Sequence, residues 1–253
     1  TNVCENDPPI VRMSIRSAEL AKISLNAFVT MKISFANTIA ELCENLPDGD
    51  AEAVSSLLGF DSRISRKYLT GALAYGGPCF PRDNKAFAFF AQQIGCKARL
   101  SEATDKENKH QNERMVALAK QKVGDIRDKK IAVLGLTYKP DTDVIEESAA
   151  IKITDALVKG GARLSVYDPV GMENARQVLG EKGISYATSV GECLKDAEFC
   201  ILATPWPEFK KLKAEDFKAS MKQAVLLDCW RIYDSSEFRE NLEYIAIGLS
   251  SPY

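Results

Sequence analysis

The sequence predicts an α/β protein, in which a helical N-terminal region with one very long helix is followed by a doubly wound parallel-sheet domain. Residues 14–45 contain neither Pro nor Gly and repeat apolar side chains at helical spacing. After about residue 124, short apolar strands alternate with helices, a pattern typical of an open sheet covered on both faces. We therefore expect two domains, residues 1–124 and 125–253.

The first half is expected to be mainly helical after an extended arm over residues 1–12, where Pro8 and Pro9 disfavour helix. A helix over residues 14–45 would be about 45 Å long, more than one small core covers. We expect it to run between domains or to pack against a second subunit. Shorter helices are expected at 51–58, capped by Asp50, and at 81–93 and 101–123, with loop-like chain over 59–82.

The second half is expected to begin with a buried strand at residues 131–134. The string after this strand lacks G-x-G-x-x-G, so we assign no dinucleotide site to it. Ligands of such sheets bind at the carboxyl ends of strands, here residues 135–143, 168–171, 204–206 and 228–233. Further strands are expected at 163–167, 199–203, 224–227 and 244–247, and helices at 147–159 and 172–179.

The bulk composition is that of an ordinary soluble protein, with 45% hydrophobic residues, 27% charged residues and a net charge of -2. This balance gives no reason to expect a nucleic acid or an anionic membrane as a partner. No apolar stretch reaches the roughly 20 residues that cross a bilayer, and the first residues do not resemble a signal peptide. Seven cysteines without C-x-x-C and a single histidine, His110, argue against zinc or disulfides and favour the cytoplasm.

The string from Gly76 to Asp83, Gly-Gly-Pro-Cys-Phe-Pro-Arg-Asp, is the most informative one for chemistry. The two glycines allow the backbone to approach a ligand closely, and Pro81 suits the first turn of a helix. Cys79 would then precede a helix N-terminus, where the helix dipole favours the thiolate. From spacing alone, a buried structural cysteine and a nucleophile are about equally supported.

Each of the other candidate polar residues could have a functional role or could simply be a solvated surface side chain. Lys22 and Asn26 are four residues apart on the long helix and could donate to one oxyanion, although helix lysines are usually solvated. Arg63, Lys139 and Arg231 could meet phosphate or could be surface charges.

Three strings together resemble the UDP-glucose/GDP-mannose dehydrogenase family. Residues 18–28 are similar to its central helix with Lys22 and Asn26, and residues 76–83 to its nucleophile loop. Residues 135–148 resemble the entry to its C-terminal domain. The resemblance implies a central helical region that dimerises through helix 14–45, followed by a Rossmann-like domain that binds a UDP-sugar.

The resemblance also implies an activity, namely two NAD-linked oxidations of the C6 alcohol of UDP-glucose to UDP-glucuronate. Cys79 would carry a thiohemiacetal and then a thioester, and Lys22 and Asn26 would stabilise the oxyanions. Asp83 would support water activation and Lys22. Arg63 would reach the partner subunit's substrate. The residues that match substrate-binding positions are Arg63, Tyr75, Gly76, Gly77, Lys139 and Arg231.

Two departures from the family pattern affect the cofactor. The family binds NAD mainly through an N-terminal domain that this sequence does not show, so we expect the isolated chain to be inactive. Glu146 stands where relatives have an arginine that helps to hold NAD, so a cofactor role for Glu146 is doubtful. GDP-mannose or a UDP-N-acetylhexosamine are alternative substrates. A non-catalytic nucleotide-sugar-binding dimer and a purely structural dimer are alternatives of another class.

Overall fold

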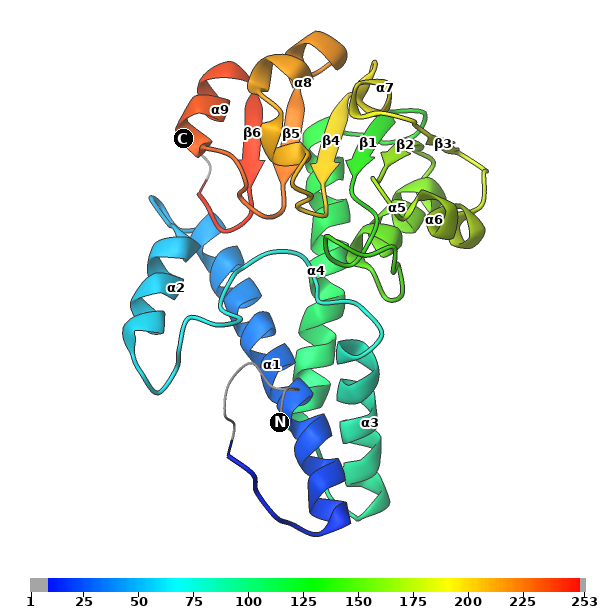
Figure 1. Ribbon diagram of the computed structural model, residues 1–253. Helices are drawn as coiled ribbons and strands as arrows, with labels where there is room; N and C mark the ends of the chain where they lie inside the picture. Colours follow the sequence, from blue (N-terminus) through cyan, green and yellow to red (C-terminus); the bar gives the residue numbers. More distant parts are fainter. Residues whose placement is uncertain (1–8, 251–253) are drawn as a thin grey trace.

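A computed structural model describes residues 9–250, which form a helical stalk below an α/β head (Figure 1). The stalk consists of four helices, and the head consists of a six-stranded sheet with helices on its faces. Part of the expected N-terminal arm, residues 1–8, lies outside the described residues, and residues 9–14 carry no helix or strand. The stalk helices are α1 (Ile15–Glu44), α2 (Ala51–Phe60), α3 (Phe80–Gln93) and α4 (Arg99–Val123).

The prediction of one very long helix is confirmed by α1, which spans 30 residues. Ser14 begins it, because the Ser14 side chain accepts a hydrogen bond from the backbone N–H of Ser17. Asp50 caps α2 in the same way by accepting from Glu52 N–H at 2.8 Å. α2 extends to Phe60, two residues further than expected, so the loop before α3 is shorter than the sequence indicated.

The head contains one parallel sheet with the strand order β3-β2-β1-β4-β5-β6. This order reverses direction between β1 and β4, as in the doubly wound folds that the sequence predicted. The strands are β1 (Lys130–Leu134), β2 (Arg163–Tyr167), β3 (Ile184–Tyr186), β4 (Phe199–Leu202), β5 (Val225–Asp228) and β6 (Glu243–Ala246). The helices are α5 (Ala149–Lys159), α6 (Met172–Leu179), α7 (Val190–Leu194), α8 (Ala214–Ser220) and α9 (Ser235–Asn241), with a short 3-10 turn at Phe209–Lys211.

The two faces of the sheet bury two separate clusters, as strand alternation requires. Ile131 and Val133 of β1 lie in the cluster that also includes Met115 of α4. Ala132 and Leu134 lie in the opposite cluster with residues of α7, α8 and α9. Because α4 belongs to both the stalk and the first cluster, it fixes the stalk to the head (Figure 1).

Among residues 9–250, no helix is both long and apolar enough to cross a membrane.

Candidate active site

Cys79 lies at the N-terminus of α3 with its side chain exposed. Its carbonyl oxygen accepts the N–H of Asp83 at 2.8 Å, which makes it the N-cap residue of a 14-residue helix. No side chain caps this end of the helix. The structure thus places Cys79 at a helix N-terminus, the position that the sequence predicted.

The two glycines before Cys79 allow the loop to touch the head. Gly77 N–H donates to the Glu146 carbonyl at 2.9 Å. A Cβ on Gly76 would lie 2.5 Å from the Glu147 carbonyl oxygen. A Cβ on Gly77 would lie 2.7 Å from the Tyr138 ring, and Gly77 has a φ of +83°, which L side chains rarely adopt. Close contact with Glu147 is thus the physical reason for Gly76, and the Tyr138 ring together with the positive φ is the reason for Gly77.

The Gly77→Ala substitution should destabilise the protein by about 2–4 kcal/mol, because backbone strain and a steric clash add. Gly95 is a matched control, because its φ is +75° but no atom lies within 4 Å of its added Cβ. Gly95→Ala should cost only the strain, about 1–2 kcal/mol. Denaturant unfolding of the two variants measures the difference, and equal losses would contradict a contact between Gly77 and Tyr138.

Asp83 joins α1 to α3 through buried polar contacts. Its Oδ2 accepts the Asn26 side-chain N–H at 2.7 Å, and its Oδ1 lies 3.1 Å from the Arg82 guanidinium. Asn26 and Asp83 are both buried, whereas Lys22 is exposed on the same helix. Within residues 9–250, Lys22 has no ion pair. The structure therefore brings Asn26 and Asp83 together one helical turn after Cys79, and Asp83 pairs with Arg82, where Lys22 was the expected partner.

A cleft of about 520 Å³ opens between the stalk loop before α3 and the head. Tyr138 and Lys139 line it from the turn after β1, and Trp230 lines it from the turn after β5. These turns are at carboxyl ends of strands, where the sequence placed a ligand. Five of its twelve lining residues are aromatic and Lys139 supplies the one ammonium group, so we call it the aromatic cleft. The other lining residues are small or aliphatic, namely Ile33, Thr70, Ala72, Leu73, Ala74 and Gly76.

Two of the arginines lie outside this cleft. Arg63 is 87% exposed and pairs with Asp61 at 2.6 Å. Arg231 lines a neighbouring hollow of about 400 Å³, which shares Thr70 and Trp230 with the cleft. The structure thus places Lys139, Tyr75 and Gly76 in one cleft, Arg231 beside it and Arg63 on the surface.

Comparisons with known proteins agree with this arrangement. Residues 16–110 match the central domain of the UDP-glucose/GDP-mannose dehydrogenase family, and residues 132–235 match its UDP binding domain. The chain belongs to this family. The two matched segments fall on the stalk and the head, respectively.

Similar proteins include UDP-glucose 6-dehydrogenase of Rhizobium meliloti, 39% identical over 248 residues, which cover 96% of this chain and 55% of that protein. The UDP-glucose 6-dehydrogenase of Haloferax volcanii is also 39% identical, over 94% of this chain and 53% of its own length. A UDP-glucose dehydrogenase structure from Pyrobaculum islandicum superposes with a TM-score of 0.87 at 34% identity, covering 96% of this chain and 54% of the other. The chain spans about half the length of the curated relatives it matches.

The sequence predicted a ligand at the strand end formed by residues 168–171, but it did not single out Asp168. It follows β2, and its Oδ2 accepts the backbone N–H groups of Leu136 and Thr137 at 2.7 and 3.1 Å and the Trp206 indole N–H at 3.0 Å. A dinucleotide site of this fold would offer such N–H groups after β1 to a pyrophosphate. Because a buried carboxylate already uses them, the switch point between β1 and β4 does not fit NAD in this family member.

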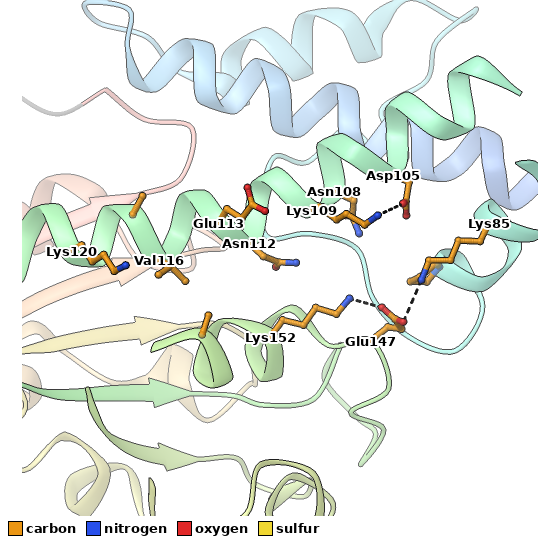
Figure 2. Close-up of a pocket in the computed structure, with 13 residues that line it drawn as sticks. Lys85, Asp105, Asn108, Lys109, Asn112, Glu113, Val116, Lys120, Glu147 and Lys152 are labelled. Atoms are coloured by element: carbon orange, nitrogen blue, oxygen red, sulfur yellow. Dashed lines mark hydrogen bonds and ion pairs between the residues drawn. The ribbon is translucent and has the colours of Figure 1, made fainter. Parts of the chain in front are cut away.

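Another hollow, of about 610 Å³, lies between α4, α5 and the start of α3 (Figure 2). Five of its seven charged side chains pair with one another. Lys85 and Lys152 both contact Glu147, and Lys109 lies 2.8 Å from Asp105.

Lys139 lines the aromatic cleft and not this hollow. Cys79 lines neither, and its neighbours Phe80 and Pro81 line the cleft and the hollow, respectively. We place the candidate active site in the cleft because Lys139, Tyr75 and Gly76 all line it.

Within the part of the chain that the structure describes, no cluster of three or more His, Cys, Asp or Glu side chains could hold a metal ion.

Proposed function

We propose that this chain is the thiol-bearing and nucleotide-sugar-binding half of a UDP-glucose 6-dehydrogenase. The observation that carries the proposal is the exposed Cys79 at the N-terminus of α3, two residues from Gly77 and next to Phe80, which lines the aromatic cleft with Lys139. The names of the two curated relatives support UDP-glucose as the substrate. We place the boundary of the two functional domains near Gly124, where α4 ends.

In this proposal Cys79 attacks the aldehyde carbon of the half-oxidised sugar, because a thiolate forms a covalent thiohemiacetal with an aldehyde. The chain would hold this carbon as a thiohemiacetal and later as a thioester until water releases the acid. Asn26 and Lys22 would donate to the oxygen where charge develops. The buried Asp83 orients the Asn26 amide, at 2.7 Å, and would support the attacking water.

The hydride acceptor in the proposal is NAD. In this proposal NAD would bind to the half of the relatives that this chain does not match, because Asp168 already uses the backbone N–H groups after β1. The contact of Glu146 with the site is made by its backbone, since its carbonyl oxygen accepts the Gly77 N–H. This contact gives no support for a role of the Glu146 side chain in NAD binding. We expect no NAD reduction by this chain alone.

The nucleotide end of the substrate would occupy the cleft, where aromatic side chains can stack on a base or ribose and Lys139 can meet a phosphate. Arg63 is exposed and lines neither the cleft nor the hollow beside it, and in the proposal it contacts the substrate of a second subunit, so a homodimer is part of the proposal. Exposed apolar side chains on α1, among them Phe28, Phe35 and Leu42, supply a surface for it.

Substrate binding can be tested by titrating the chain with UDP-glucose, UDP and GDP-mannose in a calorimeter. We expect UDP-glucose and UDP to bind more tightly than GDP-mannose. Lys139→Ala should weaken UDP binding about tenfold, because it removes a charge-assisted contact to phosphate. Lys210→Ala removes an exposed lysine elsewhere on the head and should have no effect. Absence of heat with all three nucleotides would exclude the proposal.

A non-catalytic nucleotide-sugar-binding dimer is the second candidate, because Asp168 occupies the backbone N–H groups after β1 that a dinucleotide would use. Adding the unmatched N-terminal half of a relative, together with NAD and UDP-glucose, discriminates between the two. Restored NAD reduction that depends on Cys79 supports the enzyme, and binding without restored reduction supports the second candidate.

A further inference from the structure

The turn after β5 is held rigidly by Asp228, the last residue of that strand. The Asp228 side chain accepts the backbone N–H groups of Trp230 at 2.9 Å and of Ile232 at 2.8 Å. It also accepts the Tyr244 hydroxyl at 2.8 Å, and it is fully buried. Burial raises the pKa of the Asp228 carboxyl above its usual value, and the hydrogen bonds that it accepts offset this rise only in part. These contacts leave Arg231 with a φ of +53° at the apex of the turn.

The Arg231 guanidinium is held by a residue from the stalk. Its Nη1 donates to Asp50 Oδ1 at 2.6 Å, across 181 positions of sequence. The Asp50 side chain is 38% exposed and that of Arg231 is 23% exposed, so the pair lies at the edge of the hollow that adjoins the cleft. The hydrogen bond from Arg231 is the main cause that lowers the pKa of Asp50.

Asp50 itself is fixed in two ways. It caps α2, and its backbone forms an antiparallel bridge with Leu249 of the head. Ala51 N–H donates to the Gly248 carbonyl at 2.8 Å, and Ser250 N–H donates to the Gly49 carbonyl at 3.0 Å. The carboxylate that meets Arg231 therefore belongs to a rigid junction between stalk and head.

We propose that Asp50 is a positioning residue, whose carboxylate orients the Arg231 guanidinium beside Trp230 for contact with the anionic nucleotide end of the substrate. This inference rests on the proposed function, because it takes Arg231 as a substrate contact. Trp230 lines both hollows, so a shift of the Arg231 turn would alter the wall of the cleft as well. Asp228 fixes the backbone of the turn, and Asp50 fixes the guanidinium.

The experiment measures UDP-glucose binding to the chain by calorimetry, with thermal unfolding as a fold check. Asp50→Asn removes the charge but keeps a good N-cap for α2, so it should fold normally. It should weaken UDP-glucose binding about tenfold, as should Arg231→Ala. The double variant should bind no more than about twofold more weakly than Arg231→Ala, because both substitutions remove one coupled unit.

Two further variants separate positioning from a general structural effect. Asp234→Asn changes the N-cap of α9 at the rim of the same hollow, and Asp234 has no contact with Arg231, so binding should not change. Asp50→Glu keeps the carboxylate and should bind within about threefold of the original chain. Equal weakening by folded Asp50→Glu and Asp50→Asn would overturn the role of the carboxylate.

The remaining outcomes are also decisive. If Arg231→Ala weakens binding and Asp50→Asn does not, the positioning role is wrong while the proposed function stands. If neither variant weakens binding, or if the effects of the two are additive, the positioning role is wrong as well. If the unchanged chain binds neither UDP-glucose nor UDP, the inference and the proposed function fail together.

Discussion

Replacing Cys79 by Ala should reduce turnover at least about a thousandfold in an enzyme reassembled from this chain and the unmatched half of a relative, because in the proposed mechanism Cys79 holds the covalent intermediate. UDP-glucose binding should stay within about twofold of the original value, since in the proposal the cleft, and not the thiol, binds the nucleotide end. The measurements are NAD reduction at saturating UDP-glucose and calorimetric titration. Retained turnover in Cys79→Ala would show that the thiol is not the nucleophile.

The chain offers an internal control for the reactivity of this thiol. Cys79 and Cys96 are both exposed, whereas Cys43, Cys193, Cys200 and Cys229 are buried. Iodoacetamide at neutral pH should therefore label Cys79 several-fold faster than Cys96, because only Cys79 lies at a helix N-terminus. UDP-glucose should slow the labelling of Cys79 and leave Cys96 unchanged. Equal labelling rates for Cys79 and Cys96, with no slowing of Cys79 by UDP-glucose, would contradict an activated thiol beside a sugar site.

Much of the fold could be predicted because its signals are local. The expected helix 14–45 differs from α1 (Ile15–Glu44) by one residue at each end, since periodicity and the Ser14 cap are both written in adjacent residues. β3 was missed because it has three residues, half exposed at the edge of the sheet. α7, α8 and α9 were missed because helices of five to seven residues show little periodicity and depend on packing against the sheet.

The site was predictable only where it is contiguous in sequence. Cys79 and its glycines lie within one short string, so the helix N-terminus and the close backbone approach could both be inferred. The bond from Asn26 to Asp83 spans 57 positions, and the bond from Arg231 to Asp50 spans 181. Only the tertiary fold determines such pairs. An acid directly before Pro169 at a strand end was a signal for Asp168, but nothing local indicated that its carboxylate turns inward.

Charged substitutions on α1 should separate the proposed dimer into monomers. Phe28, Phe35 and Leu42 are 60%, 51% and 61% exposed, respectively, and they follow one another at intervals of seven residues. Seven residues are nearly two helical turns, so these side chains form one apolar stripe along a helix about 45 Å long. An unpaired stripe of this kind is unfavourable in water, and a second copy of α1 would cover it.

Phe28→Asp combined with Phe35→Asp should raise the dimer dissociation constant at least about a hundredfold, because each carboxylate would have to be buried against apolar side chains. Sedimentation equilibrium measures this constant. Val178→Asp is the matched control, since Val178 is 64% exposed on α6 of the head, away from the stripe. A double variant that remains dimeric would place the interface elsewhere. If Arg63 reaches the partner's substrate, the monomeric variant should also bind UDP-glucose about as weakly as Arg63→Ala does, although its own cleft is unchanged.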